Sequence, residues 1–261
     1  MNQLQPVEHP ALMHPNRTIG ATLNPLPAHI AIIPDGNSRW ARAHGRLPVD
    51  GYKAGLRVLE NIVEYADSVG VQYLTAYFAS RDNIMKRGAA WSRVFFEFAL
   101  STIKQYFNKS AIDRYQVKII GDLSSVPDFV RHEFEQLVER TKNNTGLVFT
   151  IAIAYTGKFE ILHAVNTLIK SRVRDGIDMP VSAEELAAHM DLHGIPPPEL
   201  LIRSSGQLRL SGFLLWHLEY TELAFPQEFW PDFTVERFKE LLMDYQLRTR
   251  TFGSERYVQH A

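Results

Sequence analysis

The sequence contains no cysteine among its 261 residues. Disulfides, cysteine-bound zinc, iron–sulfur clusters and a thiolate nucleophile are therefore excluded, and a reducing cytoplasm is the simplest compartment. The sequence also lacks an apolar run of about 18 residues, and a basic stretch followed by an apolar one. We therefore expect a soluble protein without a membrane span or a signal peptide.

The net charge is close to zero, because 28 Lys and Arg residues nearly balance 29 Asp and Glu residues and leave a formal charge of -1. A chain without an overall positive field has no general means of holding a polyanion, so we expect no nucleic-acid partner and only local anion binding. Apolar residues make up 45% and charged residues 22%, as in ordinary globular proteins. The length suits one large domain with an appendage.

Several common enzyme motifs are missing as well. There is no GxGxxG and no GxSxG, and Gly157-Lys158 lacks the rest of a Walker loop. These absences argue against a dinucleotide enzyme and a serine hydrolase. His189 and His193 stand four residues apart, but no third metal ligand accompanies them, so we interpret them as ordinary histidines near a helix end.

Strand and helix patterns alternate along the chain after residue 28. Residues 1–28 hold five of the 14 prolines and only two charges, which predicts a poorly ordered arm, with one catalytic domain over residues 29–261. Strands are expected at residues 29–33, 72–79, 117–120, 147–154, 199–203 and 219–225, and helices at 52–69, 91–107, 126–140, 159–173, 182–190 and 234–245. The alternation predicts an α/β fold, a single domain with a largely parallel central sheet and helices on both faces.

Two predicted strand ends carry polar groups suited to phosphates. The first is Ile33-Pro34-Asp35-Gly36-Asn37-Ser38-Arg39-Trp40, in which a carboxylate, a glycine and an arginine are parts of a phosphate and Mg²⁺ site. The second runs from Leu201 to Gly212 and carries two arginines, three serines and two glycines that suit a second polyanion. A plain turn and a solvated surface loop are the competing interpretations.

The order of motifs resembles the cis-prenyltransferases, the undecaprenyl diphosphate synthase family. HIAIIPDGNSRWA is similar to the signature that binds the allylic diphosphate, and NTGL followed by IAIAYTGK is similar to the central strand. LLIRSSGQLRLSGFLLWHLEYTELAF, FWPDF and the tail around RTFG follow in the family's order, and the match spans residues 29–253. The aspartate-rich DDxxD motif of trans-type enzymes is absent, since the chain has no Asp-Asp pair.

The resemblance implies prenyl transfer from an allylic diphosphate to isopentenyl diphosphate, with Mg²⁺ as the cofactor and a homodimer as the assembly. It implies that Asp35 and Asn37 are catalytic and that Asp35 binds the metal. Glu222 would complete the metal site, in the same subunit or from its neighbour. The implied substrate-binding residues are Gly36, Arg39 and Trp40 for the allylic substrate and Arg203, Arg209 and Ser211 for isopentenyl diphosphate.

The chain departs from the family pattern at five positions that bear on the substrate and on proton removal, namely Pro48, Tyr52, Ile84, Gln207 and Gly212. The family's small residue on the second strand is also replaced, because Phe78 stands in its place. Phe149 and Ile153 are bulky at corresponding points of the central strand. We expect these side chains to narrow the tunnel and to stop the product at ten to fifteen carbons.

Two alternatives share this sequence pattern. One is an irregular enzyme that joins two allylic diphosphates, or ionises and cyclises one. The other is a catalytically silent subunit that supports a partner prenyltransferase. A silent subunit is expected to lose the metal aspartate and the paired arginines, whereas this chain keeps Asp35, Arg203 and Arg209.

Overall fold

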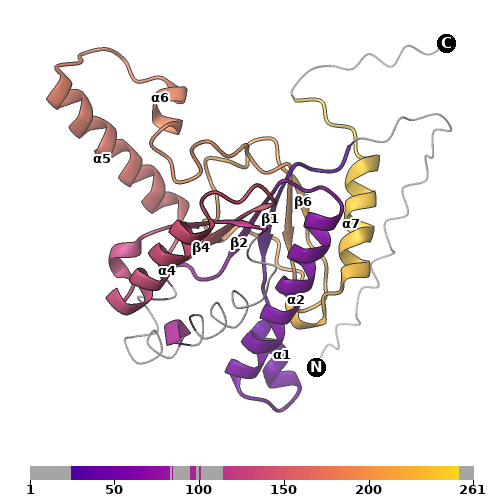
Figure 1. Cartoon of the computed structure of the whole chain (residues 1–261). Helices are drawn as coiled ribbons and strands as arrows, with labels where there is room; N and C mark the ends of the chain where they lie inside the picture. Colours follow the sequence, from indigo (N-terminus) through magenta and orange to yellow (C-terminus); the bar gives the residue numbers. More distant parts are fainter. Residues whose placement is uncertain (1–24, 83, 85–94, 98–99, 101–113, 253–261) are drawn as a thin grey trace, which may run out of the picture.

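The fold centres on one six-stranded sheet in which every pair of neighbours is parallel (Figure 1). The computed structural model describes residues 25–82, 84, 95–97, 100 and 114–252. The strand order is β3-β4-β2-β1-β5-β6. The strands are β1 (His29–Ile33), β2 (Tyr73–Tyr77), β3 (Gln116–Ile120), β4 (Val148–Ala152), β5 (Leu200–Arg203) and β6 (Glu222–Ala224). The predicted α/β class with a parallel sheet is confirmed.

The described helices follow the expected alternation with some changes at their ends. They are α1 (Asn37–Ala43), α2 (Pro48–Ser68), α4 (Asp128–Thr141), α5 (Gly157–Asp175), α6 (Ala183–Ala187) and α7 (Val235–Leu247). α2 begins four residues before the expected start, because Pro48 suits the first helical position and the Asp50 carboxylate accepts the N–H of Leu47 at 3.2 Å. α6 ends at Ala187 rather than at residue 190. Most of the expected 91–107 helix lies outside the described residues.

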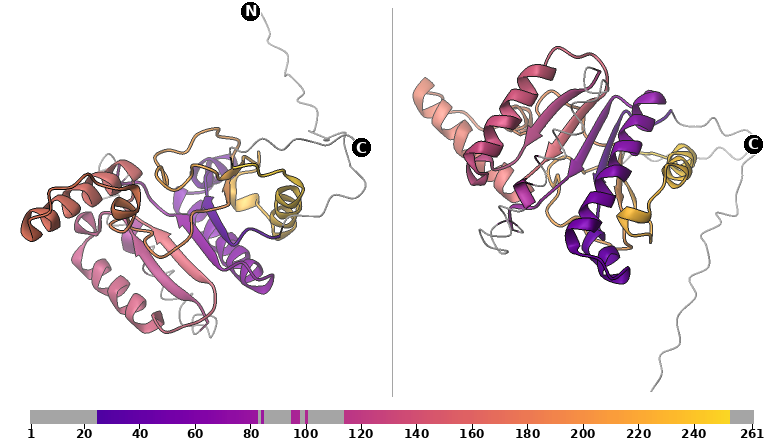
Figure 2. Two further views of the ribbon diagram at one scale, coloured as in Figure 1. Left: turned by 90° about the horizontal axis from the view of Figure 1, so that it is seen from above. Right: turned by 60° about the horizontal axis from the view of Figure 1, so that its bottom comes forward.

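Two cores lie on the two faces of the sheet. On one face α2, α4 and α7 pack against the strands around Ile62, Phe134 and Phe238. α2 and α7 lie side by side there (Figure 2). Between them the rings of Tyr65 and Phe238 meet edge to face, with their centroids 6.1 Å apart. The smaller core on the other face is covered mainly by the irregular segments 192–195 and 210–218. α5 projects away from the sheet, and α6 follows it (Figure 1).

The chain preceding β1 is attached to the body from residue 26 onward. Leu26 packs against the larger core, and the carbonyl of Ala28 accepts the N–H groups of Gln72 and Tyr73. Residues 1–24 of the expected arm lie outside the described residues. Within residues 25–82 and 114–252, no helix has the length and apolar character that crossing a membrane requires.

The strand order places the two phosphate-type motifs next to each other. β1 and β5 are direct neighbours, with Ile33 opposite Arg203. Because parallel strands end at the same edge of a sheet, the segments that begin at Pro34 and at Ser204 emerge there side by side. The sheet thereby brings residues about 170 positions apart into one site.

A buried histidine, His29, opens β1 and is fully excluded from solvent. Its Nδ1 lies 2.6 Å from the carbonyl of Pro196 and therefore donates, so Nε2 accepts the hydroxyl of Thr75 at 2.8 Å. Burial lowers the pKa of His29 from 6.5 to about 4. The folded protein thus holds this ring neutral.

We predict that the free energy of unfolding falls as the pH drops from 6.5 to 4. In this window His29 is protonated in the unfolded state but stays neutral in the folded state. The difference between the two pKa values corresponds to a loss of about 3 kcal/mol in the free energy of unfolding. Urea unfolding of the wild type and of His29→Gln at pH 7, 5.5 and 4.5 tests this. The variant should lose less stability on acidification than the wild type, and identical losses would contradict the assignment.

Candidate active site

A pocket of about 720 Å³ opens at the carboxyl ends of β1, β2 and β5. Its polar side comes from the segment after β1 and from the segment after β5. Its apolar side includes Leu56 and Leu59 of α2 together with Phe78 and Phe95. A cavity of this size with one polar and one apolar end suits a ligand with a charged head and a hydrocarbon tail.

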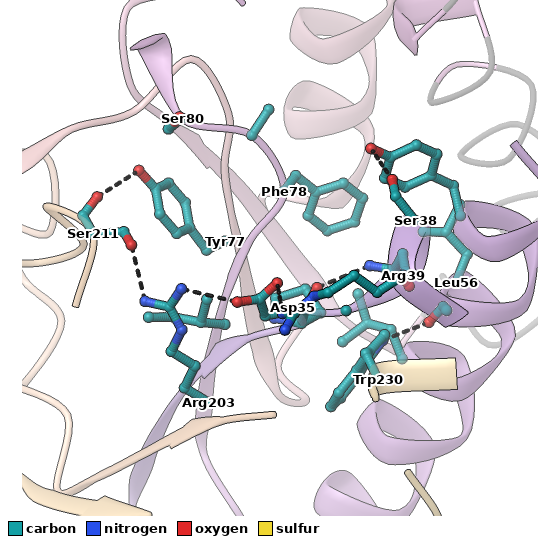
Figure 3. Close-up of a pocket in the computed structure, with 18 of the residues that line it drawn as sticks. Asp35, Ser38, Arg39, Leu56, Tyr77, Phe78, Ser80, Arg203, Ser211 and Trp230 are labelled. Carbon is teal, nitrogen blue, oxygen red and sulfur yellow. Dashed lines mark hydrogen bonds and ion pairs between the residues drawn. The ribbon is translucent and has the colours of Figure 1, made fainter. Parts of the chain in front are cut away.

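Asp35 lies at the polar end, between two arginines from different segments (Figure 3). Its Oδ1 accepts a hydrogen bond from Nη2 of Arg39 at 3.0 Å, and its Oδ2 accepts one from Nη2 of Arg203 at 2.9 Å. One carboxylate therefore holds the guanidinium of α1 and that of β5 on its two oxygens.

The protonation state of Asp35 follows from this pairing. Burial by itself would raise the pKa of the carboxyl, but the hydrogen bond and charge of Arg203, and then the charge of Arg39, outweigh it. The pKa of Asp35 is therefore below its usual range. The group is an anion at neutral pH, as a metal ligand or a partner of two cations must be.

Arg203 organises the segment that follows β5. Arg203 is only 4% exposed. Its Nη1 donates to Oγ of Ser211 at 2.9 Å and also to the carbonyl of Arg209. The side chain of Arg209 lines the pocket and donates to Oε1 of Gln207 at 2.6 Å. Arg203, Arg209 and Ser211, the residues expected to bind isopentenyl diphosphate, are thus gathered at one end of the cavity.

Gly36 and Asn37 shape the turn between β1 and α1. Gly36 has φ 103°, a left-handed value that favours glycine, and a Cβ here would come within 2.7 Å of the Phe229 ring. The same ring lies 5.3 Å from the guanidinium carbon of Arg39. Asn37 donates from Nδ2 to the carbonyl of Pro34 at 2.9 Å, whereas its buried Oδ1 has no hydrogen-bond partner among the residues that the structure describes. Both residues line the pocket.

Two expected substrate or metal residues do not line the pocket. The indole N–H of Trp40 donates to Asp232 at 2.6 Å and so attaches α1 to the chain before α7. Glu222 lies on the outermost strand β6, and its Oε2 accepts from Nη1 of Arg248 at 3.1 Å. Trp40 therefore has a packing role in this structure, and Glu222 does not meet Asp35 within the same chain.

Of the three expected chain-length residues, only Phe78 lines the pocket. Phe149 is 4% exposed and Ile153 fully buried, and both pack in the larger core. On β4 the side chains of Phe149 and Ile151 share one face because alternate residues do, and that face meets the helices. Phe149 and Ile153 therefore lie in the core beside the sheet and not among the described residues that line the pocket.

The structure adds residues to the site that the motifs did not select as catalytic or binding residues. Tyr52, Leu56 and Leu59 follow one another at helical spacing on α2, and Oγ of Ser38 donates to the hydroxyl of Tyr52 at 3.2 Å. Ser205 accepts from Nη2 of Arg39 at 2.6 Å. The helical spacing was visible in the sequence, but the side that faces a cavity was not.

Comparison with known proteins identifies the family. The family described as "Putative undecaprenyl diphosphate synthase" matches residues 33–253. This chain is a member of the undecaprenyl diphosphate synthase family, the cis-prenyltransferases. The resemblance found in the motifs is thereby confirmed, and the chain is a prenyl-transferring enzyme of isoprenoid biosynthesis.

Relatives align over most of the chain. Dehydrodolichyl diphosphate synthase 2 of Arabidopsis thaliana is 41% identical over 237 residues, covering 88% of this cis-prenyltransferase and 75% of the relative. An isoprenyl transferase of Clostridium tetani is 37% identical over 239 residues, covering 88% and 91%.

Two solved structures match as well. Lavandulyl diphosphate synthase from Lavandula x intermedia, in complex with dimethylallyl diphosphate, gives a TM-score of 0.79 at 30% identity and covers 88% of this chain and 99% of that one. A probable undecaprenyl diphosphate synthase from Campylobacter jejuni gives 0.74 at 26% identity, with 89% and 100% covered.

We predict that Asp35→Asn lowers kcat on the order of 10³-fold, because the variant keeps the shape of the side chain but loses the charge that faces two arginines. Steady-state kinetics and circular dichroism measure turnover and folding. Asp128→Asn is the matched control, since it removes a carboxylate paired with Arg131 at 2.6 Å on an exposed helix. Turnover within threefold of the wild type would remove Asp35 from the mechanism.

Proposed function

We propose that this cis-prenyltransferase condenses an allylic diphosphate with isopentenyl diphosphate in the presence of Mg²⁺ and releases a product of ten to fifteen carbons. The observation that supports this most is the Asp35 carboxylate between Arg39 and Arg203, at the polar end of a pocket whose far side is apolar. Charged groups for two diphosphates thus adjoin space for a hydrocarbon chain.

The two arginine-bearing segments divide the substrates between them. Gly36, Asn37 and Arg39 face the allylic diphosphate, and the segment with Arg203, Arg209 and Ser211 faces isopentenyl diphosphate. As the allylic carbon–oxygen bond breaks, negative charge accumulates on the departing diphosphate, where fixed guanidiniums stabilise it. The double bond of isopentenyl diphosphate forms the new carbon–carbon bond, and loss of a proton completes the transfer.

The residues at the polar end suit Mg²⁺. This ion usually binds through one or two carboxylates and completes its shell with substrate phosphates and water. Asp35 offers an ionised carboxylate in the pocket, and the described residues include no group of three acidic or histidine side chains that could hold a metal without substrate. When bound, Mg²⁺ would neutralise part of the charge on the leaving diphosphate. A contribution from Glu222 would have to come from a neighbouring subunit.

The pocket wall supports a short product. The ring of Phe78 lies at the end of β2 and borders the same cavity as Leu56 and Phe95. Each added isoprene unit needs space that a close-packed interior does not release without displacing such rings. Phe78 carries this proposal by itself, since Phe149 and Ile153 pack in the core.

We predict that Phe78→Ala lengthens the product by at least one five-carbon unit, because removal of the ring extends the cavity. Mass spectrometry of products from geranyl diphosphate and excess isopentenyl diphosphate measures chain length. Phe129→Ala, a half-exposed ring on α4, serves as the control and should leave the wild-type distribution unchanged. Wild-type chains of fifty carbons or more would refute the short-product proposal.

An irregular reaction is the second candidate, and one observation favours it. Lavandulyl diphosphate synthase, solved with dimethylallyl diphosphate, matches this chain over 99% of its length at a TM-score of 0.79. Incubation with Mg²⁺ and dimethylallyl diphosphate alone, compared with dimethylallyl, geranyl or farnesyl diphosphate plus isopentenyl diphosphate, separates the two reactions. A coupled or cyclised product from the allylic substrate alone would favour the irregular enzyme. No product from any mixture would favour a silent partner subunit.

We also propose a homodimer with the C-terminal block, residues 200–233, at its interface. Several apolar side chains of this block are exposed, including Leu215, Trp216, Tyr220 and Leu223, which are 38–54% exposed. The rings of Tyr220 and Phe252 lie 5.8 Å apart. A second copy of the chain would cover these side chains.

We predict a dimer in sedimentation velocity at micromolar concentration, and we expect Leu223→Asp to shift it toward monomer by burying a charge at the interface. Val173→Asp, at an exposed apolar position of α5, is the comparison variant and should remain dimeric. A monomeric wild type would contradict the assembly, and dissociation by Val173→Asp alone would move the interface to α5.

A further inference from the structure

The regular backbone hydrogen bonding between β1 and β5 ends where the active site begins. Regular pairing ends with Ile33 opposite Arg203, and Pro34, which directly follows β1, has no N–H to donate. The N–H of Ser204 lies 3.4 Å from the carbonyl of Ile33, a long contact for a strand ladder. Beyond this point the main chain of Asp35 is held by a tight turn, in which its N–H donates to the carbonyl of Ile33 at 2.9 Å, and by contacts from other segments.

The side chain of Ser204 makes two of these contacts. Its Oγ accepts the N–H of Asp35 at 2.9 Å and donates to the carbonyl of the same residue at 2.8 Å. A hydroxyl has one donor and two acceptor sites, so both bonds can form together. Ser204 is fully buried and does not line the pocket. One hydroxyl thus holds both main-chain polar groups of Asp35 without facing the cavity.

Neighbouring backbone hydrogen bonds hold Asp35 and Ser204 in the positions that this contact requires. The carbonyl of Asp35 also accepts the N–H of Trp230 at 2.9 Å, so its peptide is fixed from a third segment. Ser205, the next residue, has φ 72°, and its N–H donates to the carbonyl of Glu228 at 2.7 Å. This left-handed turn presents the Ser205 hydroxyl to Arg39 while Ser204 holds Asp35. Consecutive serines thus fix the two members of one ion pair.

We propose that Ser204 is a positioning residue of the prenyl-transfer site. By fixing the main chain of Asp35, its hydroxyl sets the direction in which the carboxylate points, between Arg39 and Arg203, where the carboxylate would hold Mg²⁺ once a diphosphate is bound. Residues that orient a metal-binding group often matter nearly as much as the group itself. Because Ser204 acts through Asp35, its role rests on the proposed function.

The test compares Ser204→Ala with Ser204→Thr, which keeps the hydroxyl, and with Ser204→Cys, which keeps the shape but bonds weakly. Thr141→Val is the matched control. Its hydroxyl is also buried and also bridges main-chain groups, accepting from Val117 at 3.1 Å and donating to Leu137 at 2.9 Å, but it does not border the pocket. The control measures what the loss of any such hydroxyl does to stability.

We predict that Ser204→Ala lowers kcat by about 10- to 100-fold and raises the Mg²⁺ concentration needed for half-maximal activity. KM for isopentenyl diphosphate should change less than about threefold, since Arg203 and Arg209 remain. Ser204→Thr should recover most of the activity. Calorimetry with inorganic pyrophosphate should show binding weakened about tenfold or more when Mg²⁺ is present, and little change without it. The melting temperature should fall no further than in Thr141→Val.

Wild-type Mg²⁺–pyrophosphate affinity in Ser204→Ala, or equal losses in Ser204→Ala and Thr141→Val, would overturn the proposal. If Ser204→Ala does not fold, Ser204→Cys carries the same comparison. If the wild type turns over no substrate pair, the proposed function fails by itself, and pyrophosphate binding still decides the role of Ser204. A wild type that binds no Mg²⁺–pyrophosphate would overturn both.

Discussion

The ionic contact of Asp35 with Arg39 and Arg203 determines the arrangement of the whole cleft. Two guanidiniums that approach from different segments would repel each other in a partly buried site, and the carboxylate between them removes that repulsion. Each arginine takes one carboxylate oxygen, so the pair is held at a fixed separation. Two guanidiniums from different segments can therefore lie side by side at the polar end of the pocket.

The chemistry of a prenyl transferase needs this charged end and an apolar wall in one cavity. The sheet edge supplies the charges, because parallel strands all end there. The buried side of α2 supplies the wall through Leu56 and Leu59. α2 packs closely against Trp230 because Gly55 has no side chain and leaves room for the indole. The indole N–H donates to the Gly55 carbonyl at 2.7 Å. The charged and the apolar side of the pocket thus come from separate elements that meet at one cavity.

Much of this could be predicted from local sequence patterns. Apolar runs of β-type residues located the strands, helical spacing located α2, α4, α5 and α7, and the alternation indicated a parallel sheet. The motifs around Asp35 and Arg203 carried enough information to place the chain in its family and to select the residues that line the polar end. The early start of α2 at Pro48 was missed because the apolar pattern begins later than the capping residues do.

The sequence by itself determined the elements and the chemical groups available, since propensity, periodicity and motif order are local properties of a chain. Only the tertiary structure decided that Trp40, Phe149 and Ile153 belong to packing and that Glu222 lies on an outer strand away from Asp35. The same holds for Ser204, whose hydroxyl meets a residue 169 positions away. Such contacts depend on which strands become neighbours and on which face a side chain takes, and parallel pairing sets both through bonds between distant segments.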